Sequence, residues 1–146
     1  MGNPPRIVLD TNALLMSLPR KSPYRLIFDA FLAGNIEFLI DNAILNEYVE
    51  IIEKRSDVIV AQNIGELLSN SPHVRRPQVT TKWLLITGDP DDDKFVDCAV
   101  AGGADYLVTN DKHFNILKTI SFPPINVVNI DTFLTVVQSL IENKEK

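Results

Sequence analysis

The chain has 146 residues, of which 45% are hydrophobic, so it can build one packed core and we expect a single domain over residues 1–146. Its net charge of −5 and pI near 4.9 argue against a broadly basic nucleic-acid-binding surface, which typically requires a pI above about 9. The single Cys98 excludes an internal disulfide, and no Cys and His pairs have zinc-finger spacing, which argues against structural zinc and favours a reducing cytoplasm.

Membrane association is also not expected. No apolar stretch approaches the roughly 20 residues that span a bilayer. Residues 1–6 lack the apolar segment of a secretion signal. We therefore expect a soluble cytoplasmic protein with no membrane partner.

Short apolar runs alternate with segments of helical spacing along the chain. In chain order, the runs predict strands at residues 7–9, 37–40, 83–86, 106–108 and 126–130. The spacing and the capping residues predict helices at 22–34, from 41 or 42 to 52, at 58–68, from 92 or 93 to 102, and from 131 or 132 to 141, with a loop at 69–77. Strands that alternate with helices indicate an α/β protein with a Rossmann-like, three-layer α/β/α fold around a central, mainly parallel sheet.

Four acidic residues stand where such a fold would gather them. They follow strands directly or lie in the first turns of helices: Asp10, Glu47, Asp93 and Asp111. Open parallel sheets bind ligands beyond the carboxyl ends of their strands, so we expect these side chains to converge. Crowded carboxylates repel one another, and a hard cation such as Mg²⁺ or Mn²⁺ relieves that repulsion. The chemistry that follows is metal-assisted attack of water on a phosphoester.

Polar neighbours of the first and last acids could hold a carboxylate in place. Thr11 or Asn12 could do so beside Asp10. Thr109, two residues before Asp111, could orient a carboxylate or a bound water.

The third acid is the least defined, because residues 89–93 hold four aspartates, more than one helix cap needs. Asp92, Asp93 and Asp97 all compete for the position. Asp97 lies one helical turn after Asp93 and could be an auxiliary ligand or an exposed charge.

Each of these positions also has an ordinary structural explanation. Residues 10–12 and 109–111 could be caps or turns, for which Asp, Thr and Asn are favoured. Glu47 could be a solvated helix residue. Four separate explanations of this kind leave the shared placement at strand ends unexplained.

Other residues are expected to be structural or peripheral. His73 and His113 have no partner at ligand spacing and are interpreted as surface or loop residues. Cys98 and Trp83 are expected in the core. Basic residues could hold a phosphate backbone at the margins of the acidic site or be plain solvated surface: Arg20, Lys21, Arg25, Arg75 and Arg76.

Taken in order, the motifs resemble the PIN-domain family of ribonucleases, in the branch of toxin components akin to VapC. The resemblance runs over nearly the whole chain and rests on residues 7–12, Glu47, residues 89–95 and residues 101–111. It implies a Rossmann-like fold, Mg²⁺ or Mn²⁺ dependence, cleavage of RNA and usually a homodimer. A toxin would also have a cognate antitoxin protein as a partner. By similarity the four acidic positions are Asp10, Glu47, Asp93 and Asp111, with Asn12 and Thr109 in support.

Two rival functions remain on the sequence alone. A haloacid-dehalogenase-like phosphatase would need a second acid two residues after Asp10, where Asn12 stands. A non-catalytic module that binds RNA or protein could keep all four acids as a docking surface or as a structural metal site.

Overall fold

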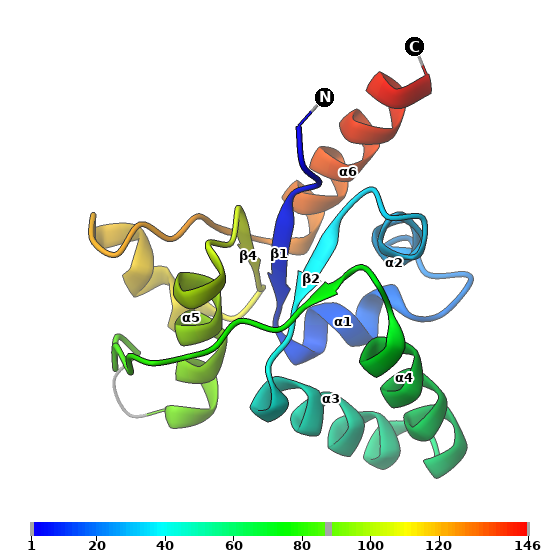
Figure 1. The fold of residues 1–146 in the computed structure, drawn as a ribbon, viewed down its shortest axis with the longest axis horizontal. Helices are drawn as coiled ribbons and strands as arrows, with labels where there is room; N and C mark the ends of the chain where they lie inside the picture. Colours follow the sequence, from blue (N-terminus) through cyan, green and yellow to red (C-terminus); the bar gives the residue numbers. More distant parts are fainter. Residues whose placement is uncertain (1, 87–88, 146) are drawn as a thin grey trace.

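The computed structural model describes residues 2–86 and 89–145, and its centre is a sheet of five parallel strands (Figure 1). The strands lie in the order β3-β2-β1-β4-β5. Their bounds are β1 Arg6–Leu9, β2 Glu37–Leu39, β3 Val74–Arg75, β4 Tyr106–Val108 and β5 Val127–Val128. The predicted α/β/α architecture with a parallel sheet is therefore confirmed.

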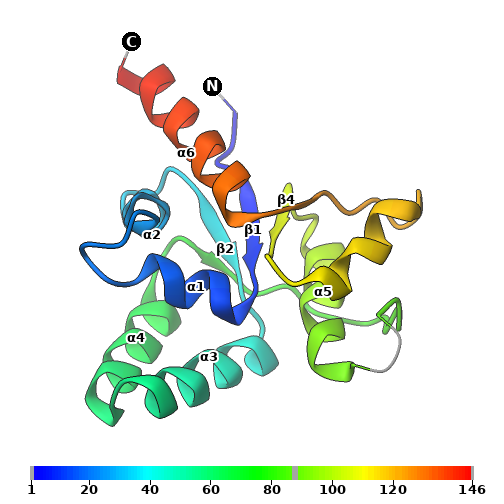
Figure 2. The ribbon, with the colours of Figure 1, turned by 180° about the vertical axis from the view of Figure 1, so that it is seen from behind.

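Helices cover both faces of this sheet. Their bounds are α1 Thr11–Ser17, α2 Arg25–Leu32, α3 Asn42–Arg55, α4 Val58–Asn70, α5 Pro90–Gly102 and α6 Ile130–Glu145, with a 3₁₀ helix, η1, at Lys112–Thr119. Helix α2 packs against α1 and α6 on the face seen in Figure 2, and α5 packs on β1, β2 and β4 from the face seen in Figure 1. None of the described helices is both long and apolar enough to cross a membrane.

The central strand β1 is buried on both faces. Ile7 and Val8 have 0% exposed surface and Leu9 has 1%. A strand covered on both sides reads as a continuous apolar run, which is why residues 7–9 were recognisable from the sequence. The run ends at Asp10, so the first polar side chain after β1 emerges at the carboxyl edge of the sheet.

The prediction of a strand at residues 83–86 is wrong, because these residues belong to no strand of the sheet. The backbone N–H of Trp83 donates to Asp97 Oδ1 at 3.0 Å, and that of Ile86 donates to Asp93 Oδ1 at 3.0 Å. Two carboxylates of α5 thus take the place of a neighbouring strand as hydrogen-bond partners, and Leu84 has a left-handed backbone with φ of 52°. Trp83 is only half-buried and packs edge-on against Phe122 rather than in the core, whereas Cys98 is buried as expected.

The remaining strand lies within the segment expected to be a loop. Val74 and Arg75 form β3 by pairing with Phe38 and Leu39 of β2. Two residues are too few to show the alternation by which a strand is recognised.

Several helix boundaries also differ from those expected, including the start of α5, which lies at Pro90 rather than at residue 92 or 93. Helix α1 was not anticipated, and α2 begins at Arg25 rather than at residue 22. Helix α6 begins at Ile130, because Asn129 Oδ1 accepts from the N–H of Thr132 at 2.7 Å and replaces the expected caps at residues 131 and 132. These shifts are local and leave the order of the elements unchanged.

One buried hydrogen bond fixes α3 against the end of β1. The Tyr48 hydroxyl, 1% exposed, donates to the carbonyl of Leu9 at 2.6 Å. Since Glu47 precedes Tyr48 in the helix, this contact also sets the position of the second acid.

Replacing Tyr48 by Phe should lower the free energy of unfolding by about 1–2 kcal/mol, because the Leu9 carbonyl loses a buried donor without any change of side-chain shape. Urea denaturation measures the change. Tyr106→Phe is the matched control: among the described residues the Tyr106 hydroxyl has no hydrogen-bond partner, and its removal should cost less than about 0.5 kcal/mol. Equal losses in the two variants would contradict the assignment.

Candidate functional site

Asp10 is held from two sides at the end of β1. Its Oδ1 accepts from the N–H of Ala13 at 2.8 Å and so caps α1, while its Oδ2 accepts from the hydroxyl of Thr109 at 2.5 Å. The residue is 7% exposed. A carboxylate oxygen has more than one lone pair, so these bonds orient Asp10 without exhausting its capacity as a ligand.

Glu47 is not a freely solvated helix residue. Its Oε2 accepts from the hydroxyl of Thr11, and its Oε1 lies 2.6 Å from Nζ of Lys94, which projects from α5. The carboxylate and the ammonium group are both largely buried, with side-chain exposures of 23% and 16%. The two contacts fix the direction in which the Glu47 carboxylate points.

Asp111 follows β4 and is connected to Asp10 through Thr109. The N–H of Asp111 donates to Thr109 Oγ1 at 3.0 Å, so this one hydroxyl contacts both acidic residues. Asp10, Asp111, Asn12 and Asn110 line a cavity of about 200 Å³. Asn12 is exposed and its Oδ1 accepts from Arg55 at 3.3 Å.

Three of the four expected acids influence one another electrostatically. Burial raises the pKa of Asp10, hydrogen bonds from Thr109 and Ala13 oppose the shift, and the negative charges of Asp111 and Glu47 raise it further. The structure therefore brings Glu47 and Asp111 within range of the Asp10 charge, beside the cavity that Asp10 and Asp111 line.

The Asp93 and Asp97 carboxylates of α5 are buried. Asp93 is 8% exposed and Asp97 is 6% exposed, and each has one oxygen bound to a backbone N–H of the segment before α5. The charge of Asp93 also raises the pKa of Asp97, after the larger effect of burial. Asp97 is thus a loop anchor rather than an exposed charge. No hydrogen bond among the described residues joins Asp93 to the other three acids.

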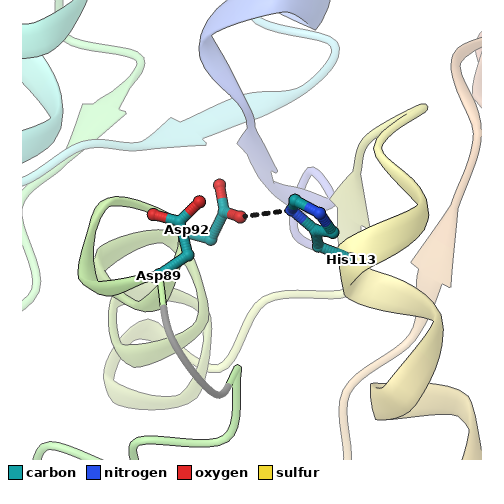
Figure 3. Close-up of side chains that lie close together, drawn as sticks. All are labelled: Asp89, Asp92 and His113. Atoms are coloured by element: carbon teal, nitrogen blue, oxygen red, sulfur yellow. Dashed lines mark hydrogen bonds and ion pairs between the residues drawn. The ribbon is translucent and has the colours of Figure 1, made fainter.

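Asp92, unlike Asp93, has contacts that connect it to Asp111. Its Oδ2 is 3.3 Å from Nδ1 of His113, and ligand atoms of Asp89, Asp92 and His113 all lie within 4.8 Å of one another (Figure 3). Nδ1 of His113 is also 3.5 Å from Asp111. Burial and the charges of Asp89 and Asp111 raise the pKa of Asp92 to about 6, while the hydrogen bond from His113 opposes the shift.

The expectation for His113 needs correction. Its side chain is 64% exposed, as a surface residue should be, but it does have partners at ligand spacing. The contact with Asp92 spans 21 residues, so no local spacing in the sequence could reveal it. Proximity to Asp111, two residues earlier, is the one signal that was present.

The donor set suits a hard divalent cation. Asp89, Asp92 and His113 offer ligand atoms at ligand spacing, and burial with neighbouring negative charge raises the pKa of Asp92 and, beside the cavity, of Asp10. Three of the basic residues proposed to hold a phosphate backbone at the margins of the site already have partners within the protein. Arg25 pairs with Asp29, Arg75 pairs with Glu37, and Arg76 donates to a backbone carbonyl.

A parallel α/β/α sheet with acids gathered at its carboxyl edge defines the structural class, and comparison of the sequence then gives the family. The model of the PIN domain family matches residues 6–113. This chain belongs to the PIN domain family.

Solved structures show the same fold. A chain of the VapBC2 complex from Rickettsia felis, bound to a DNA fragment from its promoter, matches with 20% identity and a TM-score of 0.57, covering 85% of this chain and 98% of that one. DNA-bound VapBC from Salmonella typhimurium matches with 20% identity and a TM-score of 0.56, covering 86% and 98%. The PIN domain endonuclease Utp24 matches with 22% identity and a TM-score of 0.51, covering 88% and 86%. No curated protein gives a significant match.

The raised pKa of Asp92 has a consequence for stability in metal-free buffer. Because the folded state binds this proton more tightly than the unfolded state, with a pKa of about 6 against 3.8, the free energy of unfolding should fall as pH rises from about 4 through 6. The side chain that Asp92→Asn introduces cannot ionise, so this variant should lack the fall. Its free energy of unfolding, minus that of wild type, should therefore be larger at pH 7 than at pH 4. Urea denaturation in EDTA across this range measures the effect.

Asp91→Asn is the control for that experiment, since the Asp91 side chain is 87% exposed and lies in the same turn. It should keep the pH dependence of wild type. Identical pH profiles for Asp92→Asn and wild type would show that Asp92 is not the group responsible.

Proposed function

We propose that this protein is a Mg²⁺- or Mn²⁺-dependent endoribonuclease that hydrolyses RNA phosphodiester bonds at the acidic site. The observation that carries the proposal is the meeting of the Asp10, Glu47 and Asp111 charges beside a cavity at the carboxyl edge of the sheet. Membership of the PIN domain family supports it. The proposed metal-binding and catalytic residues are Asp10, Glu47, Asp93 and Asp111, with Asn12, Thr109 and Asp97 in supporting positions.

The chain's own residues would prepare the site in three ways. Thr109 and Ala13 hold Asp10, and Thr11 and Lys94 hold Glu47, so neither carboxylate needs to be ordered when a cation binds. A bound divalent cation would stabilise charge on the phosphate and lower the pKa of the attacking water. No covalent nucleophile is needed, and burial of Asp10 strengthens every charge interaction in the site.

We assign the third acidic position to Asp93. One of its oxygens anchors Ile86, which leaves the other available to a ligand, and its burial beside the end of the sheet matches that of Asp10. Asp92 is the rival, because its contacts connect it to Asp111. The two assignments predict that different substitutions, Asp93→Asn or Asp92→Asn, cause the larger loss of cleavage.

The similarity in fold to chains of two VapBC complexes supports a second part of the proposal, which concerns protein partners. We propose that this protein is the toxin of a toxin–antitoxin pair, with a cognate antitoxin as its protein partner, and that it forms a homodimer. Co-expression with any small protein encoded next to this one, followed by size-exclusion chromatography with light scattering, would show whether a complex forms and how many copies it holds.

Cleavage of RNA should require both the metal and Asp10. EDTA should abolish cleavage by wild type, excess Mn²⁺ should restore it, and Asp10→Asn should lose more than the roughly 10–100-fold that removal of an outer partner costs. Asp57→Asn is the matched control, because Asp57 also caps a helix by accepting an N–H at 2.8 Å but lines neither the cavity of Asp10 nor the acidic group around His113. Cleavage that survives both EDTA and Asp10→Asn would refute the proposal, and tight metal binding without cleavage would favour a non-catalytic module.

Asp93→Asn and Asp97→Asn separate ligation from loop anchoring. In both variants the amide oxygen can still accept the backbone N–H, so the segment before α5 keeps its anchor. Asp93→Asn should therefore lose cleavage and Mn²⁺ affinity, measured by calorimetry, by more than the roughly 10–100-fold effect of an outer partner, and Asp97→Asn should lose less. A loss with Asp92→Asn that exceeds the loss with Asp93→Asn would transfer the third position to Asp92.

A further inference from the structure

A second cavity opens beside the acidic one. It measures about 360 Å³, and its lining includes Asn110, Asp111, Lys112, Asn115, Lys118 and Asn129. These residues come from the end of β4, from η1 and from the turn before α6, which lie together in Figure 2. Asn110 and Asp111 also line the cavity that contains Asp10. The two cavities therefore share a wall, and an extended ligand in one can continue into the other. We call the second cavity the lysine cleft.

Two lysines in the cleft are free to meet an anion. Lys112 and Lys118 are exposed, and neither forms an ion pair within residues 2–86 and 89–145. In this acidic protein, Lys94 and Lys54, by contrast, are paired with glutamates. An ammonium group carries three donors and no acceptor, so it suits a phosphate oxygen.

Two asparagines add donors whose direction is fixed. Asn110 Oδ1 accepts from the N–H of Ile130 at 3.0 Å, and Asn129 Oδ1 accepts from the N–H of Thr132 at 2.7 Å. Because only the amide oxygen can accept from a backbone N–H, each NH₂ group is left to donate. The cleft thus combines cationic and neutral donors, which is the chemistry of an anion-binding surface.

The carboxylates in the cleft do not block it. Asp131 Oδ1 accepts from the Tyr24 hydroxyl at 2.8 Å, and Asp111 Oδ1 accepts from the N–H of His113 at 2.9 Å. Asp111 stands in the shared wall, where a cation in the acidic site would offset its charge. Both lysines belong to η1, which follows Asp111 in the chain, and both line the cleft.

We propose that the lysine cleft binds the phosphodiester backbone of a single-stranded RNA next to the bond that is cut, an inference that rests on the proposed ribonuclease function. The ligand is identified by continuity: a chain whose phosphate reacts in the acidic cavity would enter the lysine cleft with its neighbouring phosphate. Lys112 and Lys118 neutralise that phosphate, and the Asn110 and Asn129 amides position it. The contacts reach backbone atoms only, so the cleft contributes affinity without preference for base sequence.

Salt dependence of binding tests the cleft directly. A fluorescein-labelled single-stranded RNA of about 12 nucleotides is titrated with protein carrying Asp10→Asn, and anisotropy gives the dissociation constant at several salt concentrations. Each lysine that neutralises a phosphate on a single strand contributes about 0.7 to the slope of log affinity against log salt. Adding Lys112→Gln and Lys118→Gln should therefore reduce the slope by about 1.4 and weaken binding for every sequence tried.

The control removes the same charge elsewhere. Lys54 pairs with Glu50 on α3, and Lys144 lies near the end of α6 and contacts Asn35. Lys54→Gln with Lys144→Gln should leave the slope unchanged. An unchanged slope in the cleft variant, equal losses in both double variants, or no RNA binding at all would overturn the proposal. So would lysine-dependent binding of polyglutamate without binding of RNA, which would indicate an acidic protein partner.

Failure of the proposed function gives a different result. If wild type cleaves no RNA with any metal, but binding still depends on Lys112 and Lys118, the ribonuclease assignment fails and the cleft remains an RNA-binding site. If wild type cleaves RNA and the lysines do not affect binding, the cleft assignment alone fails.

Discussion

The Thr109 hydroxyl joins the ends of the two central strands, and the site depends on this contact. Leu9 pairs with Val108 in the parallel register of β1 and β4, so the next residues, Asp10 and Thr109, emerge side by side at the carboxyl edge. The hydroxyl donates to the Asp10 carboxylate and accepts from the N–H of Asp111. One polar atom thereby holds two acids whose charges oppose their approach. The register of β1 and β4 therefore determines how far apart Asp10 and Asp111 lie.

Electrostatics explains why the remaining acids need separate partners. Burial and mutual repulsion raise the pKa of Asp10, and the chain offsets part of this cost with hydrogen bonds rather than with an ion pair. Glu47 receives an ammonium group, from Lys94. The Asp93 and Asp97 carboxylates are stabilised by backbone N–H groups instead. Each acid is thus compensated locally, although the protein as a whole carries a net charge of −5.

Much of the fold, and the neighbourhood of the site, could be predicted from the sequence, because strands buried on both faces leave continuous apolar runs and the acids follow those runs. The failures were non-local. Residues 83–86 look like a strand, but side chains from α5 bind their backbone. Strand β3 has only two residues and is defined by its neighbour. The approach of His113 to Asp92 depends on how η1 and α5 pack, which no spacing records. The same reason explains why sequence alone could not decide among the aspartates that open α5.

In the proposed site, the short side chain of Asp93 both accepts from the Ile86 N–H and offers its other oxygen to a ligand, which restricts what can replace it during evolution. A glutamate would keep the negative charge but carry it one methylene farther from the helix, so its carboxylate would no longer meet the Ile86 N–H in the same geometry. An asparagine would keep the length and the anchor but not the charge. Natural variation at this position should therefore separate active descendants, which retain aspartate, from inactive ones that keep the fold with asparagine.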